Sequence, residues 1–271
     1  YDHKEITPED YKECCFHSQK RIGDIGYLSN IIENHDEPRG VSHYIPDGDL
    51  SLQSKKFLAA MYFMLRGLPF IYQGQEIGMT NCIRNDISEY DDISTKDQYQ
   101  VAIDAGCSRE EALRCCYENS RDNARTPMQW TDDENAGFTD GTPWLAMNPN
   151  YRQINVREQE ARTDSVLAYY RRLVHLRKAD AYRETFTYGI FEPAYQEMAD
   201  VFAYYRVSGE SGQRILVAAN FGTDAVSLPL AYPCRQVLLS NLRAESAVEM
   251  ACEKANALTL ESCEVAVIEL G

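Results

Sequence analysis

The sequence has no apolar run near the roughly 18 residues that a membrane-spanning helix needs, and it lacks any excess of positive charge. Its 27 basic residues stand against 42 acidic ones, which gives a formal net charge of −15. Nucleic acids and anionic membranes both require a basic surface that displaces counterions. We therefore expect no nucleic-acid partner and no membrane partner, and a neutral or cationic small ligand instead.

The N-terminus has no basic start followed by an apolar stretch, so no signal peptide is visible, and CxxC spacing is missing as well. The chain has 9 cysteines, an odd number in a chain too large to need disulfide staples, which favours reduced thiols and a cytoplasmic location. Two pairs are adjacent in sequence, Cys14-Cys15 and Cys115-Cys116. Thiols packed in helices are expected there in preference to a metal or redox site.

Helical and strand patterns alternate along the first 72 residues. Apolar residues make up 44% of the chain and charged residues 25%, which is enough to bury a core. The patterns predict a helix over 7–20, a strand over 27–33, a helix over 51–66 and a strand over 68–72. Short links between such segments indicate α/β units around a parallel sheet. Both strands are apolar on adjacent positions, as in a sheet covered on both faces.

The composition changes after residue 80. Residues 80–162 are rich in Asp, Asn, Gly and Tyr, and connections this long are usually functional. Three further helices are predicted, over 96–105, 108–118 and 164–178. Beyond residue 181 the pattern has period two, with strands predicted over 201–207, 214–221, 225–230, 235–241 and 264–270. We predict two domains, 1–180 with its long loop 80–162, and an antiparallel β domain over 181–271.

Residues 33–39, ENHDEPR, place Asn34, His35 and Asp36 where the first strand should end. In a parallel α/β barrel, the loops at the carboxyl ends of the strands form the active site. An ionised Asp beside an imidazole can stabilise a developing cation or hold a substrate hydroxyl. The alternative is a structural ion pair between Asp36 and Arg39 that caps the next helix.

Two more stretches carry polar groups that suit a ligand site. In ENSRDNARTPMQW (118–130), Arg121 and Arg125 flank Asp122 near Trp130, and such a set can clamp a hydroxylated ligand; the alternative is a solvated loop held by Arg–Asp pairs. The stretch FIYQGQEIGMTN (70–81) places polar groups at the mouth of the second strand, which suit either a supporting role at a site or a buried turn. They are Gln73, Gln75 and Glu76.

Together with AGFTDGTPWLAMNPNYRQINVREQ (136–159), these stretches resemble the oligo-1,6-glucosidase and α-glucosidase branch of the α-amylase superfamily, glycoside hydrolase family 13. The resemblance covers nearly the whole chain. It implies the C-terminal part of a TIM (β/α)₈ barrel over 1–180, with the long loop 80–162 as the excursion after the eighth strand. A small antiparallel β-sandwich domain over 181–271 would follow, so the fold class is α/β plus all-β.

The resemblance also implies roles for individual residues. Family members are retaining glycosidases, with a nucleophile and an acid/base whose carboxyl groups lie about 5–5.5 Å apart, and with a third carboxylate after strand seven. Asp36 matches this third carboxylate, and His35 matches the neighbouring histidine that donates to a sugar hydroxyl. Arg121 matches the arginine that reaches the same sugar. Supporting roles are expected for Arg39, Arg125 and Glu76.

The sequence departs from the family in several places. Gln75 and Ser94 stand where relatives usually carry glutamate, and the change at Ser94 leaves the leaving-group preference open. No stretch matches the nucleophile or acid/base motifs, and about six of the eight barrel strands are missing. We therefore expect the C-terminal half of an enzyme that is inactive alone, with the other half of the barrel as its partner and with self-association of the isolated chain. No cofactor is predicted, because the calcium ion of some relatives lies in an N-terminal barrel loop.

Three functions remain open at this point. The first is an α-glucosidase that releases glucose from the non-reducing end of short α-glucosides such as isomaltose. The second is a sucrose isomerase or a trehalose synthase of the same family. The third is a non-catalytic amylase-like scaffold subunit, which has no physical need for His35, Asp36 and Arg121 together. The preference between α-1,6 and α-1,4 linkages stays open, because the residue that decides it lies beside the nucleophile.

Overall fold

The computed structural model of the chain describes residues 7–45 and 49–271. Contacts divide these residues into two compact units. The first comprises Ile31–Lys55 and Ile71–Tyr169, and the second comprises residues up to Asn30, Lys56–Phe70 and Tyr170–Gly271. Each unit is a set of residues in contact and combines segments from separate parts of the sequence. The units therefore do not test the predicted domain boundary at residue 180, which stays a prediction. Within the described ranges, no helix is long and apolar enough to cross a membrane.

Helix α1 (Pro8–Ile22) begins at a capping box. The Thr7 hydroxyl accepts the Asp10 N–H at 3.1 Å, and the Asp10 carboxylate accepts the Thr7 N–H at 3.0 Å. These bonds satisfy donors that a helix start otherwise leaves unpaired. The helix packs on the C-terminal sheet through Phe16, whose ring stacks on Phe202 with centroids 5.4 Å apart. The predicted helix start at Thr7 is confirmed.

Strands β1 (Ser29–Asn30) and β2 (Leu68–Pro69) pair in parallel, with Ser29 opposite Leu68. Helix α3 (Leu52–Phe63) lies between them in the chain, so the predicted strand–helix–strand unit is present. The paired segments are shorter than the predicted strands. At their ends, Leu68 N–H donates to the Leu28 carbonyl at 2.8 Å and Phe70 N–H donates to the Asn30 carbonyl at 3.0 Å.

Gly67 makes this pairing possible, because its φ is +130° and a Cβ there would lie 2.2 Å from the Leu28 carbonyl oxygen. We expect Gly67→Ala to lower the free energy of unfolding by about 2–4 kcal/mol, from backbone strain and overpacking together. Gly106 is a matched control, because its φ is +92° but nothing lies within 4 Å of its Cβ position. Gly106→Ala should cost only about 1–2 kcal/mol in strain. Equal losses in urea unfolding of the two variants would contradict the proposed clash.

Buried arginines bind the backbone where α3 ends. Arg177 lies in α7 (Val166–Lys178), and Arg206 lies in β4 (Val201–Val207). Their guanidinium groups donate to carbonyl oxygens of residues 63–67 at 2.6–3.2 Å. Arg177 donates to Phe63, Leu65 and Gly67, and Arg206 donates to Met64. Cationic donors at this end of a helix satisfy its last carbonyls and complement its dipole.

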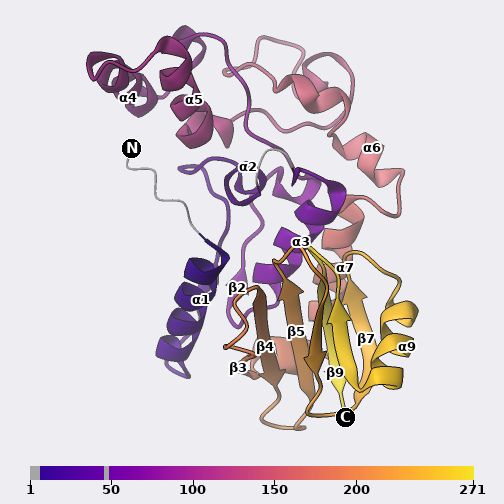
Figure 1. Ribbon diagram of the computed structural model, residues 1–271. Coiled ribbons are helices and arrows are strands. Elements are labelled where there is room, and N and C mark those ends of the chain that lie inside the picture. The colour runs from indigo at the N-terminus through magenta and orange to yellow at the C-terminus, as the bar shows by residue number, and fades with distance from the viewer. Residues whose placement is uncertain (1–6, 46–48) are drawn as a thin grey trace. The chain divides into compact units, whose positions relative to one another are not determined.

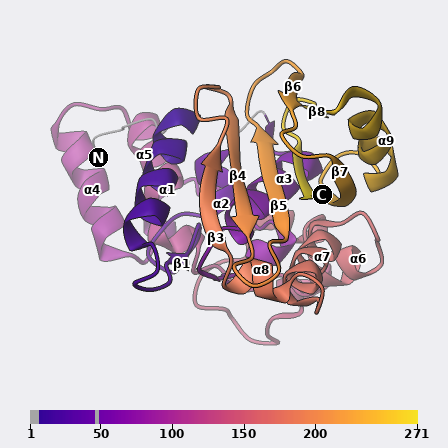
Figure 2. The same ribbon diagram turned by 90° about the horizontal axis from the view of Figure 1, so that it is seen from below.

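The C-terminal part is an antiparallel β domain, as predicted. Its main sheet has the order β3-β4-β5-β9-β7, and β6 pairs with β8 in a second sheet. The remaining strands are β3 (Ile190–Ala194), β5 (Arg214–Asn220), β6 (Val226–Pro229), β7 (Cys234–Ser240), β8 (Ala257–Leu260) and β9 (Val265–Leu270). Helix α9 (Glu245–Ala255) lies beside β7 and β8 (Figures 1 and 2). Both sheets and α9 share one core, with Leu216, Leu228, Val248, Leu258 and Ile268 among its members.

The long loop 80–162 contains two of the predicted helices, which pack side by side (Figure 1). Helix α4 (Ile93–Asp104) begins at the capping residue Asp92, and α5 (Arg109–Asn119) begins at Ser108. The other helices are short: α2 (Gly40–Tyr44), α6 (Val156–Glu160) and α8 (Arg183–Thr187). The 3₁₀ turns are η2 (Gln75–Ile77), η3 (Ile87–Glu89), η4 (Arg121–Asn123), η5 (Glu134–Gly137) and η6 (Pro149–Arg152).

Candidate active site

His35 and Asp36 lie in an exposed turn that follows β1 in the chain. The Asp36 N–H donates to the Asn34 side-chain oxygen at 2.8 Å, so Asn34 shapes the turn as an Asx turn. His35 Nε2 lies 3.2 Å from Asp36 Oδ2, and their side chains are 70% and 51% exposed. An imidazole and a carboxylate are therefore presented together to solvent, with both groups accessible to a ligand.

Two arginines from the second motif converge on Asp36. Arg125 Nη2 lies 2.8 Å from Asp36 Oδ1, and Arg121 Nη1 lies 3.5 Å from the same oxygen. Arg125 Nε also donates to the His35 carbonyl at 2.9 Å. Arg125 thus contacts the turn directly and more closely than Arg121 does. The alternative of a structural ion pair between Asp36 and Arg39 is wrong, because Asp36 pairs with the arginines of the second motif.

Asp92 also belongs to this cluster, although no motif in the sequence pointed to it. Asp92 Oδ1 lies 2.5 Å from Arg121 Nη2 and 3.9 Å from Arg125 Nη1. Its other oxygen caps α4 by accepting the Thr95 N–H at 3.1 Å and the Thr95 hydroxyl at 2.8 Å. Two carboxylates, one exposed and one buried, therefore share two guanidinium groups. This arrangement fixes the arginines while leaving Asp36 open to a ligand.

The pKa of Asp92 gives this cluster a testable pH dependence. Burial raises it, but hydrogen bonds from Arg121 and Thr95 outweigh that effect, and the pKa lies below the ordinary 3.8. Such a group adds stability that is present above its unfolded-state pKa and is lost as the pH falls through its folded-state pKa. We expect wild type to be more stable than Asp92→Asn at neutral pH, with the difference shrinking below pH 3.8. Urea unfolding across this range measures it, and a difference independent of pH would exclude the carboxylate as its source.

Arg39 lies behind the exposed turn, fully buried, and links all three motifs. Its Nη1 lies 2.7 Å from Glu33 Oε1 and 2.7 Å from the Gln73 carbonyl oxygen. Its Nε donates to the Asn123 carbonyl at 3.2 Å, and its guanidinium lies over the Tyr72 ring. The segments that follow β1 and β2 and the turn η4 are therefore held by one side chain. This position agrees with a supporting role for Arg39.

Glu33, the partner of Arg39, is also fully buried, and sequence reasoning missed it. Its second oxygen accepts the Gly40 N–H at 3.1 Å. Burial raises the pKa of Glu33, and Arg39 opposes this effect. Glu76 lies close enough to Glu33 to raise the same pKa, and Glu76 Oε2 is buried without a hydrogen-bond partner in the described structure. Glu76 therefore belongs to the layer beneath the turn, away from direct contact with Asp36.

Asp122 is buried as well, and its carboxylate binds backbone N–H groups. Its Oδ2 accepts the N–H groups of Asp91 at 2.7 Å and Asp92 at 3.0 Å. The alternative interpretation of 118–130 is wrong in calling the loop solvated, because Asp122 and Asn123 are completely buried, but the Arg–Asp pairs that it expected are present. Gln75 is buried too, and its side chain accepts the Tyr72 N–H at 3.1 Å. The second and third motifs thus supply a packed support for the exposed turn.

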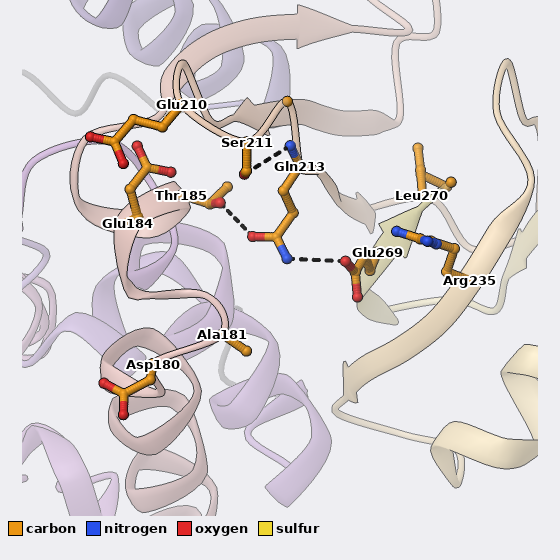
Figure 3. Close-up of a pocket in the computed structure, with 12 residues that line it drawn as sticks. Asp180, Ala181, Glu184, Thr185, Glu210, Ser211, Gln213, Arg235, Glu269 and Leu270 are labelled. Atoms are coloured by element: carbon orange, nitrogen blue, oxygen red, sulfur yellow. Dashed lines mark hydrogen bonds between the residues drawn. The ribbon is translucent and has the colours of Figure 1, made fainter.

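A cavity of 480 Å³ lies in the second unit and is lined by none of these residues (Figure 3). Gln213 crosses it, donating to Glu269 at 3.0 Å and accepting the Thr185 hydroxyl at 2.5 Å. Its ionisable lining is mainly acidic: Asp180, Glu184, Glu210, Glu269 and Arg235. Across 7–45 and 49–271, no group of three or more His, Cys, Asp or Glu side chains is placed to hold a metal ion.

Comparisons with known proteins agree with the geometry. The family described as alpha amylase, catalytic domain, matches residues 1–188. An oligo-1,6-glucosidase of Parageobacillus thermoglucosidasius is 38% identical over 246 residues, which cover 89% of this chain and 43% of the relative. An oligo-1,6-glucosidase of Bacillus cereus is 42% identical over 207 residues, 76% of this chain and 36% of the relative.

The chain is also similar to solved structures, each of which it covers only in part. Isomaltulose synthase from Klebsiella sp. LX3 superposes with a TM-score of 0.86 at 33% identity, covering 99% of this chain and 47% of that one. Trehalose-6-phosphate hydrolase from Bacillus licheniformis has a TM-score of 0.84 at 33% identity, covering 97% and 47%. The chain spans less than half the length of each of these relatives.

Proposed function

Since the chain belongs to the α-amylase catalytic-domain family, we propose that it forms part of a retaining α-glucosidase that acts on short, isomaltose-like α-glucosides from the non-reducing end. The observation that carries the proposal is the convergence of His35, Asp36 and Arg121 in one exposed cluster. A ligand with several hydroxyl groups finds carboxylate acceptors and guanidinium and imidazole donors there. The relatives named oligo-1,6-glucosidase support the choice of substrate.

Each residue has a defined role in this proposal. Asp36 accepts hydrogen bonds from sugar hydroxyls and stabilises the positive charge that develops in the oxocarbenium-like transition state. His35 donates to a hydroxyl of the same sugar, and Arg121 closes the pocket around it. Arg125 and Asp92 hold these groups in place before the substrate arrives, and such preorganisation is the main source of electrostatic catalysis.

The nucleophile and the acid/base are supplied by polypeptide outside this chain. This follows from the family's use of three carboxylates, of which only Asp36 has a matching motif here, and it fits a chain that spans 43% of its relative. The chemistry needs no cofactor from these residues. We also propose a cytoplasmic location, which the odd number of 9 cysteines in a chain too large to need disulfides supports.

Product analysis of the active enzyme on isomaltose, maltose and sucrose tests the proposal. Glucose released from isomaltose supports it, and formation of isomaltulose from sucrose would instead assign an isomerase, as the similarity to isomaltulose synthase allows. Failure to act on any of the three sugars would favour a scaffold subunit. The 271-residue chain alone should not hydrolyse 4-nitrophenyl α-glucoside. Hydrolysis by the pure chain that Asp36→Asn abolishes would contradict the assignment of the other two carboxylates.

A further inference from the structure

Trp144 is the most exposed tryptophan of the chain, and its orientation is fixed. Its side chain is 67% exposed, yet its Nε1 donates to Asp91 Oδ2 at 2.7 Å. The next residue, Leu145, is buried and anchors the backbone. A tryptophan held by its polar edge presents its apolar ring face to whatever lies outside. The indole is therefore a preformed apolar surface that stays in contact with water.

A short series of contacts connects this indole to the candidate active site. Asp91 precedes Asp92, which pairs with Arg121, and Arg121 in turn contacts Asp36. The backbone at Asp91 is fixed, because its N–H donates to the buried carboxylate of Asp122 at 2.7 Å. The ring is thus attached to the same rigid support that holds the sugar-binding arginine.

The ligand that suits such a surface is a pyranose ring. One face of a pyranose carries mostly C–H groups, which pack on an aromatic ring, while its hydroxyls need polar partners at the edge. Asp91 provides an exposed carboxylate beside the indole, and Ser94 adds an exposed hydroxyl at the start of α4. Sites that mix an aromatic surface with a few polar groups are typical for small-molecule recognition.

We propose that Trp144, oriented by Asp91, is a stacking platform for the sugar on the leaving-group side of the scissile bond. This inference rests on the proposed function. An enzyme that acts from the non-reducing end holds one sugar in its pocket, so any sugar bound outside the pocket belongs to the leaving group.

The first test compares two substrates in the active enzyme that contains this chain. Isomaltotriose has a disaccharide leaving group, whereas α-glucosyl fluoride has none to stack. Trp144→Ala should lower the ratio of kcat/KM for isomaltotriose to kcat/KM for α-glucosyl fluoride by about 10-fold, which corresponds to about 1.4 kcal/mol. Trp144→Phe, which keeps a ring, should lower it less. Phe138→Ala is the matched control, because Phe138 is an exposed aromatic of the same loop outside this contact series, and it should leave the ratio unchanged.

The second test uses the full 271-residue chain and does not depend on turnover. The chain has two tryptophans, so Trp130→Phe leaves Trp144 as the only indole emitter. Isomaltotriose should change the emission of this variant and should not change that of Trp144→Phe. Two results would overturn the platform: a ratio that does not change on Trp144→Ala in the first test, or an emission change in Trp144→Phe but not in Trp130→Phe. Either result would indicate that the exposed ring packs against protein.

The two proposals fail in different ways. If the enzyme does not hydrolyse α-glucosyl fluoride, the proposed function fails and the assignment to the leaving-group side fails with it, while the emission test still decides whether Trp144 contacts a sugar. If α-glucosyl fluoride is hydrolysed but the ratio does not change on Trp144→Ala, the function stands and the platform fails.

Discussion

Replacing Arg39 with methionine is expected to lower the free energy of unfolding by about 3–5 kcal/mol, because it leaves a buried carboxylate without its counterion. Arg39 and Glu33 are both completely buried, and their charged atoms lie 2.7 Å apart. The substitution also removes the donors to the carbonyl oxygens of Gln73 and Asn123. Urea unfolding of wild type and variant measures the loss.

The control is an arginine that also pairs with carboxylates but lies on the surface. Arg157 lies 3.0 Å from Asp132 and 2.6 Å from Asp133, but its side chain is 56% exposed. Solvent screens such pairs, so Arg157→Met should cost less than about 1 kcal/mol. The double variant Glu33→Leu/Arg39→Met should recover part of the loss, because it removes the unpaired charge as well. If Arg39→Met and Arg157→Met lowered the free energy of unfolding by similar amounts, burial of the ion pair would not be the cause of the loss.

The Arg39→Met deficit should also depend on pH, with a defined sign. Burial already raises the pKa of Glu33 above its ordinary value of 4.5, and removing Arg39 removes the main opposing effect. A raised folded-state pKa costs stability above that pKa, and the cost disappears as the pH falls below the unfolded-state value. The deficit should therefore be full at neutral pH and should narrow as the pH approaches 4.5. A deficit that is constant with pH would assign the loss to packing instead.

Asp36→Asn is expected to lower kcat of the active enzyme by about 10²–10³, the loss that follows removal of one preorganised group at a developing charge. Asparagine keeps the shape of the side chain and still accepts hydrogen bonds from Arg121 and Arg125. It lacks the negative charge that the proposed mechanism places beside the oxocarbenium-like sugar. Steady-state hydrolysis of α-glucosyl fluoride by both forms measures the effect.

Stability separates this result from a folding defect. The Asp36 side chain is 51% exposed, so the free energy of unfolding should change by less than about 1 kcal/mol. Asp132→Asn is a suitable control, because Asp132 is an exposed aspartate that pairs only with Arg157 among the described residues. It should leave kcat unchanged. A loss below about 3-fold at Asp36, small beside the effects of preorganised groups, would contradict its proposed role.

The motifs in the sequence predicted the family, the fold class and the exposed turn, and the first two are confirmed by the comparisons. The sequence could not distinguish which carboxylates the arginines bind. Asp92 has the signature of a helix cap, and Glu33 ends an apolar strand, so neither pattern indicated an ion pair. The role of Asp92 depends on contacts with Arg121, 29 residues away, and with Arg125, further along the same motif, and no local pattern encodes such contacts.

Three elements of the C-terminal domain, β3, β8 and α9, were not predicted from the sequence, and for the two strands the reason is a local pattern that contains a proline or is short. Strand β3 contains Pro193, and a proline within a strand pattern argues against a strand. The structure accommodates Pro193 because β3 is an edge strand that pairs only with β4 in the sheet order. Strand β8 has 4 residues and directly follows α9, so its pattern is too short to separate from the helix that precedes it.

The arginines that bind the end of α3 also constrain the order in which the chain folds. Arg206 lies 142 residues beyond Met64, whose carbonyl it satisfies, and Arg177 lies 110 residues beyond Gly67. Contacts over such separations form late, because the entropy of closing the intervening loop is paid before they contribute. During synthesis the chain emerges from its N-terminal side, so the Gly67 carbonyl lacks this donor until α7 has left the ribosome, and the Met64 carbonyl lacks its own until β4 has. Completion of the barrel segment at α3 is therefore coupled to formation of the C-terminal sheet.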